Sequence, residues 1–342
     1  MENGNTKNQK IMESKLYTKQ QVIEFINAGN VMLLSGSANA LKDLPKGKWI
    51  AGTTPYCMDN VGKCEEEMIF VDDFTQIAKQ SKIEVYDKDT IKNIAINGYK
   101  NGIVFLVLPI ETDVYYTFSD NSLSYEGIFD NPVVGYVACM KMEDYGKIKS
   151  KTACGIDGKL TEDKAVALYI ELPNDLAARA EIINLDAIDY DTSVIVFPKT
   201  GFLQSDCTID GKPGNIAQYL ENVIKPKVGN YSQLITSQNG ALINRDVKVV
   251  DVNKGEVSFF SSAYAGDEYR MVKHGADYLK MFNETLADKR SEVAACFSCV
   301  SYFFGGNFLG KHVSQNGIYA FGEIAYQLLN KTIVTLEIDK VG

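Results

Sequence analysis

Histidine and nucleotide-binding motifs are scarce in this sequence, and both shortages narrow its chemistry. The 342 residues include only two histidines, His274 and His312, so a Ser-His-Asp triad or a multi-histidine zinc site would have to use one or both. No G-x-G-x-x-G motif is present, and residues 211–214 (Gly-Lys-Pro-Gly) lack the Lys-Ser/Thr ending of a phosphate loop. Dinucleotide, triphosphate and classical hydrolase chemistry are therefore disfavoured.

The chain also lacks excess positive charge and long apolar runs. Its formal net charge is -9, so there is no general positive field to attract a nucleic acid. Residues 1–14 are polar, without the apolar core of a signal peptide, and no run approaches the ~18 apolar residues of a membrane span. We expect a cytoplasmic protein with neither a nucleic acid nor a membrane as partner.

The cysteines do not form the pattern of a secreted disulfide framework, because their number is odd and they are widely spaced. We expect them to be reduced. Cys296 and Cys299 form a lone C-x-x-C inside an apolar run, which is typical of small hydrophobes in a buried strand; a redox pair at a helix start is the alternative. The acidic run 65–67 is interpreted as a solvated loop, and no metal or other cofactor is expected. The seven cysteines are Cys57, Cys64, Cys139, Cys154, Cys207, Cys296 and Cys299.

What the sequence does contain is typical of a folded protein, with 45% hydrophobic and 23% charged residues. Its length suits two domains or one large domain of two related halves. Alternating helix and strand patterns predict an α/β or α+β fold in which helices flank mixed β-sheets. We predict a flexible tail over residues 1–15, an N-terminal half over 16–205 and a C-terminal half over 206–342.

Local patterns predict most elements. Thr18 and Gln21 form a capping box before an amphipathic helix that ends at Gly29. The continuously apolar run 102–109 predicts a central strand covered on both faces. Further strands are predicted at 31–34, 49–51, 131–138, 165–172, 193–197, 293–299, 316–324 and 332–338, with a strand pair over 247–260. Helices are predicted after Pro173, over 215–223 and over 268–286, and a loop over 200–214.

Two glycine-flanked polar strand ends are candidate binding elements. Residues 52–56 (Gly-Thr-Thr-Pro-Tyr) offer two hydroxyls and a ring at a strand end, although a capping turn is the alternative. Glu323 follows Gly322 in an apolar, aromatic stretch, where a pocket carboxylate and a solvated strand-end carboxylate are the two interpretations.

Four C-terminal segments, taken together, carry a family resemblance. They are residues 294–299 (Ala-Ala-Cys-Phe-Ser-Cys), 305–306 (Gly-Gly), 316–325 (Asn-Gly-Ile-Tyr-Ala-Phe-Gly-Glu-Ile-Ala) and 329–334 (Leu-Asn-Lys-Thr-Ile-Val). In this order they resemble the C-terminal half of FIST domains. Residues 49–54 and 131–135 are similar to the N-terminal half, but Pro55 and Tyr56 stand where that family has Gly-Glu, and the helix after Cys299 is shortened. The chain therefore resembles a divergent branch.

The resemblance implies an intracellular sensory domain of signal transduction rather than a conventional enzyme. Its ligand would be a small molecule such as an amino acid or related metabolite, and its output would pass to a separate signalling protein. The implied pocket lies between the halves, where Glu323 reads a cationic or donor group and Tyr56 and Tyr319 pack on the ligand. The predicted ligand-binding residues are Thr53, Thr54, Tyr56, Cys299, Tyr319, Gly322 and Glu323.

Two other functions stay open. One is a cysteine-dependent enzyme that uses Cys299 as nucleophile and His312 as base. The other is a haem-binding sensor, for which His274 and His312 are the only imidazole ligands in the sequence.

Overall fold

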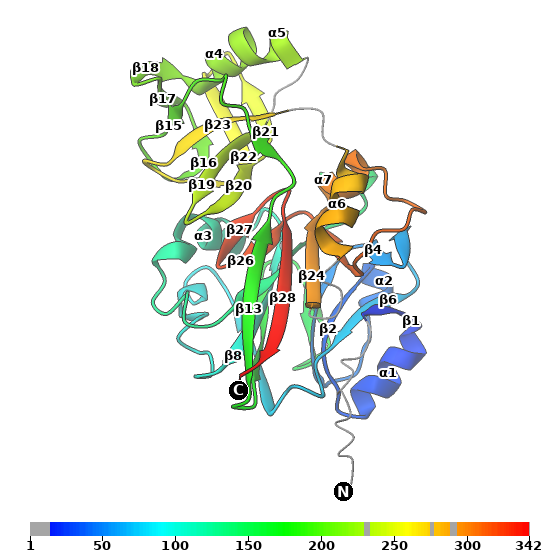
Figure 1. The fold of residues 1–342 in the computed structure, drawn as a ribbon. Coiled ribbons are helices and arrows are strands. Elements are labelled where there is room, and N and C mark those ends of the chain that lie inside the picture. The colour runs from blue at the N-terminus through cyan, green and yellow to red at the C-terminus, as the bar shows by residue number, and fades with distance from the viewer. Residues whose placement is uncertain (1–13, 229–232, 274–276, 288–292, 342) are drawn as a thin grey trace, which may run out of the picture.

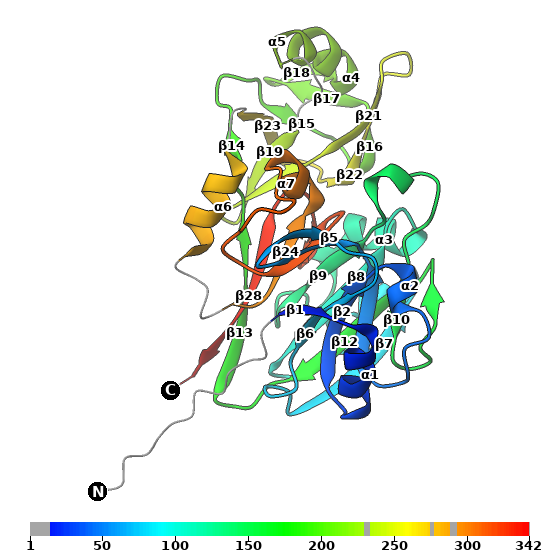
Figure 2. The same cartoon turned by 90° about the vertical axis from the view of Figure 1, so that its right-hand side faces the viewer.

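The computed structural model describes residues 14–228, 233–273, 277–287 and 293–341. The predicted mixed α/β class is confirmed, because several mixed β-sheets are flanked by helices (Figure 1). The elements form two bodies. The lower body holds residues 14–186, 277–287 and 293–341, and the upper body holds residues 187–228 and 233–273 (Figures 1 and 2).

Three six-stranded sheets build the lower body. In spatial order, the first sheet consists of β1 (Lys15–Tyr17), β6 (Ile69–Asp73), β2 (Val31–Gly36), β3 (Lys48–Thr53), β10 (Thr152–Cys154) and β11 (Leu160–Thr161). The second consists of β27 (Gln327–Leu329), β26 (Glu323–Ala325), β9 (Val133–Ala138), β8 (Gly102–Pro109), β12 (Ala165–Glu171) and β7 (Gln80–Tyr86). The third consists of β13 (Leu176–Ile183), β28 (Ile333–Lys340), β24 (Val293–Cys299), β25 (Gly317–Ala320), β4 (Tyr56–Asp59) and β5 (Val61–Cys64).

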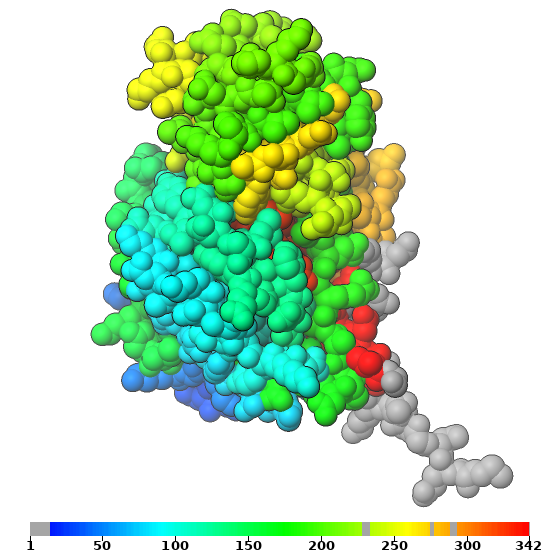
Figure 3. Space-filling view, turned by 90° about the vertical axis from the view of Figure 1, so that its left-hand side faces the viewer, coloured from blue at the N-terminus to red at the C-terminus, as the bar shows by residue number. Residues whose placement is uncertain are grey.

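The upper body sits on the lower body; Figure 3 shows part of the C-terminal segment, in red, where the two meet. One sheet has the order β18 (Lys212–Asn215), β17 (Asp206–Ile209), β15 (Ile195–Val196), β23 (Glu268–Lys273), β19 (Leu234–Gln238) and β20 (Ala241–Arg245), and β14 (Ala187–Ile188) also pairs with β23. The other consists of β16 (Gly201–Gln204), β22 (Glu256–Ala263) and β21 (Val247–Asp251).

Helices in the described residues are short. Thr18 and Gln21 form the predicted capping box of the first one. The α-helices are α1 (Lys19–Asn27), α2 (Ala38–Leu41), α3 (Asp113–Asn121), α4 (Ile216–Tyr219), α5 (Lys225–Val228), α6 (Tyr278–Leu286) and α7 (Val300–Gly305). A π-helix (Leu220–Ile224) joins α4 to α5, and 3₁₀ turns lie at Ile91–Asn93, Ser122–Ser124 and Met142–Asp144.

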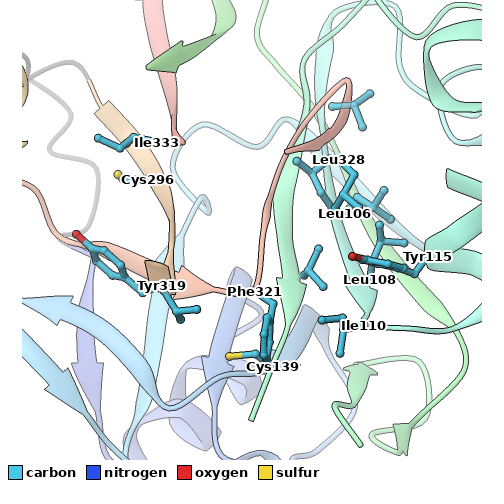
Figure 4. Packing of buried hydrophobic residues seen from close by; sticks show 14 of the residues in the cluster. Leu106, Leu108, Ile110, Tyr115, Cys139, Cys296, Tyr319, Phe321, Leu328 and Ile333 are labelled. Atoms are coloured by element: carbon cyan, nitrogen blue, oxygen red, sulfur yellow. The ribbon is translucent and has the colours of Figure 1, made fainter. Parts of the chain in front are cut away.

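The strand β8 forms the centre of the lower body, as its apolar run predicts. It lies between β9 and β12, and all eight of its residues are buried. Leu106 and Leu108 belong to one hydrophobic cluster, shown in part in Figure 4, whereas Phe105 and Val107 belong to another. Alternate side chains therefore enter cores on opposite faces of the sheet, which is why the run needs no polar face.

Segments far apart in sequence pair directly in the lower body. β4 is antiparallel to β25, with Tyr56 opposite Tyr319, and β9 is antiparallel to β26, with Tyr136 opposite Glu323. The predicted boundary at residue 205 falls between β16 and β17, inside the upper body. A relation between two sequence halves stays a prediction.

Three local predictions are wrong. The helix expected after Pro173 is strand β13, because eight residues of β28 pair with it and this pairing outweighs the helix propensity of its alanines. The loop expected over residues 200–214 contains β16, β17 and β18; Asp210 and Gly211, both with positive φ, form a hairpin turn there. The helix expected over 268–286 begins as β23, which pairs with β15 and β19, and only α6 is helical.

Candidate functional site

A cavity lies at the carboxyl ends of two parallel strand pairs in the lower body. β2 is parallel to β3 and β8 is parallel to β9, and residues that follow β2, β3 and β9 reach one space of about 570 Å³. We call it the strand-end cavity. Its lining consists of Lys19, Ser37, Ala38, Asn39, Ala40, Thr53, Thr54, Pro55, Glu66, Glu67, Cys139, Met140, Lys141, Asp144, Ile148 and Lys149.

Three buried polar side chains in the lining are held by direct hydrogen bonds. The Thr53 carbonyl accepts from the Cys139 amide at 2.6 Å, and Thr53 Oγ1 accepts from the Lys151 amide at 2.9 Å. Thr54 Oγ1 donates to the Tyr319 carbonyl at 2.6 Å and lies 3.1 Å from Cys139 Sγ. Burial raises the pKa of Cys139 to about 12, so its thiol is neutral at physiological pH. These residues therefore present a preorganised, uncharged surface to the cavity.

Tyr136 fixes the sheets next to the cavity. Its hydroxyl accepts from the Gly52 amide at 2.7 Å and donates to the Leu34 carbonyl at 2.7 Å, so the side chain of β9 bridges β2 and β3. A Cβ at Gly52 would lie 2.4 Å from Val107 Cγ1 and 2.9 Å from Tyr136 Cε2. The glycine is therefore required for close sheet packing.

Charges of both signs surround the cavity. Lys141 and Glu66 form an ion pair at 2.6 Å, and the hydrogen bond to Glu66 raises the pKa of Lys141. Lys19 and Lys149 add positive charge, and Glu67 and Asp144 add negative charge. Mixed charge around a neutral polar surface suits a small polar or zwitterionic molecule.

Among the seven predicted site residues, Thr53 and Thr54 line the strand-end cavity and the other five do not. Glu323 is fully buried in β26. Its Oε2 accepts from the Thr332 amide at 3.2 Å and from Thr332 Oγ1 at 2.8 Å, while Oε1 is buried without a hydrogen-bond partner. Burial raises the pKa of Glu323 well above its usual range. A ligand in the strand-end cavity therefore does not contact Glu323.

Packed side chains occupy the place expected for a pocket shared by Tyr56 and Tyr319. Tyr56 accepts a hydrogen bond from the Met142 amide at 2.9 Å and packs on Phe303, with 5.4 Å between ring centroids. The Tyr319 ring also packs on Phe303, with 5.5 Å between ring centroids, and belongs to the hydrophobic cluster shown in part in Figure 4. A Cβ at Gly322 would lie 2.7 Å from the Leu329 carbonyl oxygen. The two strand ends therefore meet through backbone pairing and ring packing.

A second polar region lies where the upper body meets the lower one, and we call it the seam. Lys331 Nζ is 3.1 Å from Asp186 Oδ2 and 2.7 Å from the Tyr278 hydroxyl. Asp246 has one oxygen without a hydrogen-bond partner, and burial raises its pKa to about 6. The seam consists of Asp186, Asp246, Cys299, Glu323 and Lys331, and all five are buried.

The seam position of Cys299 disfavours the cysteine-enzyme alternative. Burial raises the pKa of its thiol well above the usual range, and the nearby Glu323 and Asp246 carboxyls add to the shift. Cys299 Sγ contacts Ser301 Oγ at 3.4 Å, whereas His312 is exposed and its Nδ1 lies 2.6 Å from the Asn60 carbonyl. The two residues form no hydrogen-bonded pair in this structure.

The structure also bears on metal binding and on the haem-binding alternative. Within the described ranges, no group of three or more His, Cys, Asp or Glu side chains is arranged to hold a metal ion. His274, one of the two haem-ligand candidates, lies outside the described residues.

Sequence reasoning misses several lining residues. Ser37 follows β2 directly, but the apolar pattern predicts a strand that ends at residue 34. Cys139 attracts attention only as a thiol, although it follows the predicted strand 131–138. A polar residue directly after each parallel strand is the signal that could have identified both.

In comparison with protein families, residues 17–339 match a model described as a family of unknown function (DUF6976). Comparisons with curated proteins and with solved structures gave no match. Over the described part of the chain, helices are too short or too polar to cross a membrane.

Proposed function

Because the chain belongs to this family of unknown function, we propose a role from the site alone: the protein binds a small polar metabolite in the strand-end cavity and acts as a sensor. One observation carries the proposal. Residues after β2, β3 and β9 converge on one cavity of ligand size, at the edge where open α/β sheets bind their ligands.

The lining narrows the class of ligand. Thr53, Thr54 and Cys139 are neutral and already hydrogen-bonded. They therefore favour a ligand that is recognised by its shape and by a few polar contacts. Lys141 and Glu66 pair at 2.6 Å beside them and can exchange partners with a carboxylate and an ammonium group. An amino acid or a similar zwitterion fits this arrangement.

The sensory role has weaker support than binding. The resemblance to FIST domains suggests it, and it stays a prediction of the sequence, with output through a separate signalling protein. All seven cysteines are free, which supports a reducing compartment such as the cytoplasm.

A thermal-shift screen tests the binding proposal. A metabolite library that includes amino acids should contain a compound that raises the melting temperature of the wild-type protein, since binding at 100 times Kd adds about 2.7 kcal/mol to folding stability. Ala38→Trp fills the cavity from its α2 side and should abolish this rise. Val85→Trp, on the exposed face of β7, is the matched control and should retain it. A rise that persists in Ala38→Trp would contradict the assigned site.

A further inference from the structure

The segment 140–149 after β9, which we call the strap, forms one wall of the strand-end cavity. Met140, Lys141, Asp144, Ile148 and Lys149 line that cavity. The strap also borders a second cavity of about 1080 Å³ on the lower body, and Met140, Ile148 and Lys149 line both. It therefore has open space on two sides.

The strap is weakly held by core packing. None of residues 141–149 is buried, and Ile148 is 54% exposed. Its ends are anchored, because the Cys139 amide donates to the Thr53 carbonyl and Ser150 Oγ accepts from the Ile110 amide at 3.0 Å. Between the anchored ends only Met140 is buried, and a segment with fixed ends and open space on both sides is suited to local opening.

One aromatic side chain joins the middle of the strap to the upper body. The Tyr145 ring lies 6.4 Å from Phe260 of β22 and 5.2 Å from Phe321, between centroids. The Tyr145 hydroxyl donates to Glu111, and Lys248 of β21 forms an ion pair with the same carboxylate oxygen. The hairpin β21–β22 thus contacts the strap directly through the Phe260 ring and indirectly through Lys248, which pairs with Glu111.

We propose that Tyr145 is a positioning residue through which the hairpin β21–β22 of the upper body controls opening of the strap, and with it access to the strand-end cavity. The inference deepens the proposed function, because the strap is one wall of the proposed binding site. It names the upper body as the part of the molecule that responds when the cavity is filled. Such coupling requires contacts that differ between the open and the closed state of the strap. The contacts of Tyr145 are the ones that would differ.

Cys139 reports strap opening without any knowledge of the ligand. Its thiol lines the cavity, is fully buried and lies directly before the strap. Alkylation with iodoacetamide, followed by peptide mass spectrometry in a Cys64→Ser background, measures how often it becomes accessible, since modification tracks the open population when closing is fast. Cys57, buried in β4, reports global unfolding in the same sample.

Three variants make the test decisive. Tyr145→Ala removes two ring contacts and should raise the alkylation rate of Cys139 about tenfold relative to Cys57. Lys248→Met should raise it by a smaller factor, about two- to fivefold. Lys254→Met, in the turn of the same hairpin, removes an exposed charge without contact to Glu111 and should change nothing.

Two outcomes would overturn the inference. In one, the alkylation rates of Cys139 and Cys57 increase equally in Tyr145→Ala, which would mean that the ring stabilises the whole protein rather than the strap. In the other, the alkylation rate of Cys139 is the same in Lys248→Met as in Lys254→Met, which would mean that the upper body does not control opening of the strap. This comparison can be made even if Tyr145→Ala does not fold. Neither outcome depends on the metabolite screen, so a failure of the proposed function is recognised separately.

Discussion

The strand-end cavity and the seam are both polar, but their polar atoms have different surroundings. At the cavity, the threonine hydroxyls have partners and the surrounding charges are of both signs. At the seam, Asp246 and Glu323 each bury an oxygen without a partner, and the one lysine is committed to Asp186. A polar strand end borders a cavity only where the chain after it leaves space. Elsewhere, as at the seam, its polar atoms are buried, and those without a hydrogen-bond partner are costly.

The largest expected effect comes from breaking the seam. Lys331→Met leaves Asp186 buried without its cation and should lower the free energy of unfolding by about 3–5 kcal/mol. Urea denaturation of the two proteins at pH 7 measures the difference. Lys63→Met, which removes a half-exposed partner of Asp59, is the matched control and should cost less than about 1 kcal/mol. Equal losses would mean that the seam pair is no more important than a surface pair.

The second effect concerns pH. Burial raises the pKa of Asp72 from 3.8 to about 7, so the folded state favours its neutral form. That stability is fully present below about pH 4, where the unfolded carboxyl is also protonated, and is lost as pH rises to about 7. Asp72→Asn should remove about 4 kcal/mol of this decline between pH 4 and pH 8.

Denaturation at several pH values checks the expectation. Asp246, with its pKa near 6, should leave a residual decline that ends at lower pH. Asn in place of the exposed Asp89 should leave the profile unchanged. An Asp72→Asn variant whose decline between pH 4 and pH 8 equals that of the wild type would contradict the burial of Asp72 in its neutral form.

The third prediction concerns Gly52, which lies where the sheets pack together next to the strand-end cavity. Gly52→Ala places a methyl group against Val107 and Tyr136 and should cost about 2 kcal/mol through overpacking. It should also weaken metabolite binding, because Tyr136 bridges the strands that end at the cavity. Gly305→Ala, where the nearest atoms are 3.4 Å away, should be tolerated. Calorimetry with the ligand from the screen separates the two effects.

The smallest effect is expected at Glu323. Because burial favours its neutral form, Glu323→Gln should change the free energy of unfolding by no more than about 1 kcal/mol near pH 4, where the unfolded carboxyl is also mostly protonated. It should also retain the ligand-induced rise in melting temperature, since Glu323 lies outside the strand-end cavity. If the ligand-induced rise in melting temperature is lost in Glu323→Gln and kept in Ala38→Trp, the ligand binds at Glu323, as the sequence predicts, and not in the strand-end cavity.

Sequence patterns predict the site in part. A polar strand end after Gly52 identifies Thr53 and Thr54, and both line the cavity. The same reasoning identifies Glu323, yet its strand end is covered by the Thr332 turn. Local sequence cannot distinguish these cases, because the covering residues come from elsewhere in the chain. The Asp210-Gly211 hairpin is a different kind of miss, since a local turn signal is present but is also typical of a loop.

The sequence by itself determined what short-range physics controls: the capped helix α1, the apolar strand β8 with two buried faces, and free cysteines without a disulfide pattern. Tertiary structure alone decided that β13 is a strand and that Tyr56 lies opposite Tyr319. It also decided which polar strand ends border a cavity and which are buried. The physical reason is that pairing partners and packing space depend on residues far away along the chain, whose contributions no local pattern contains.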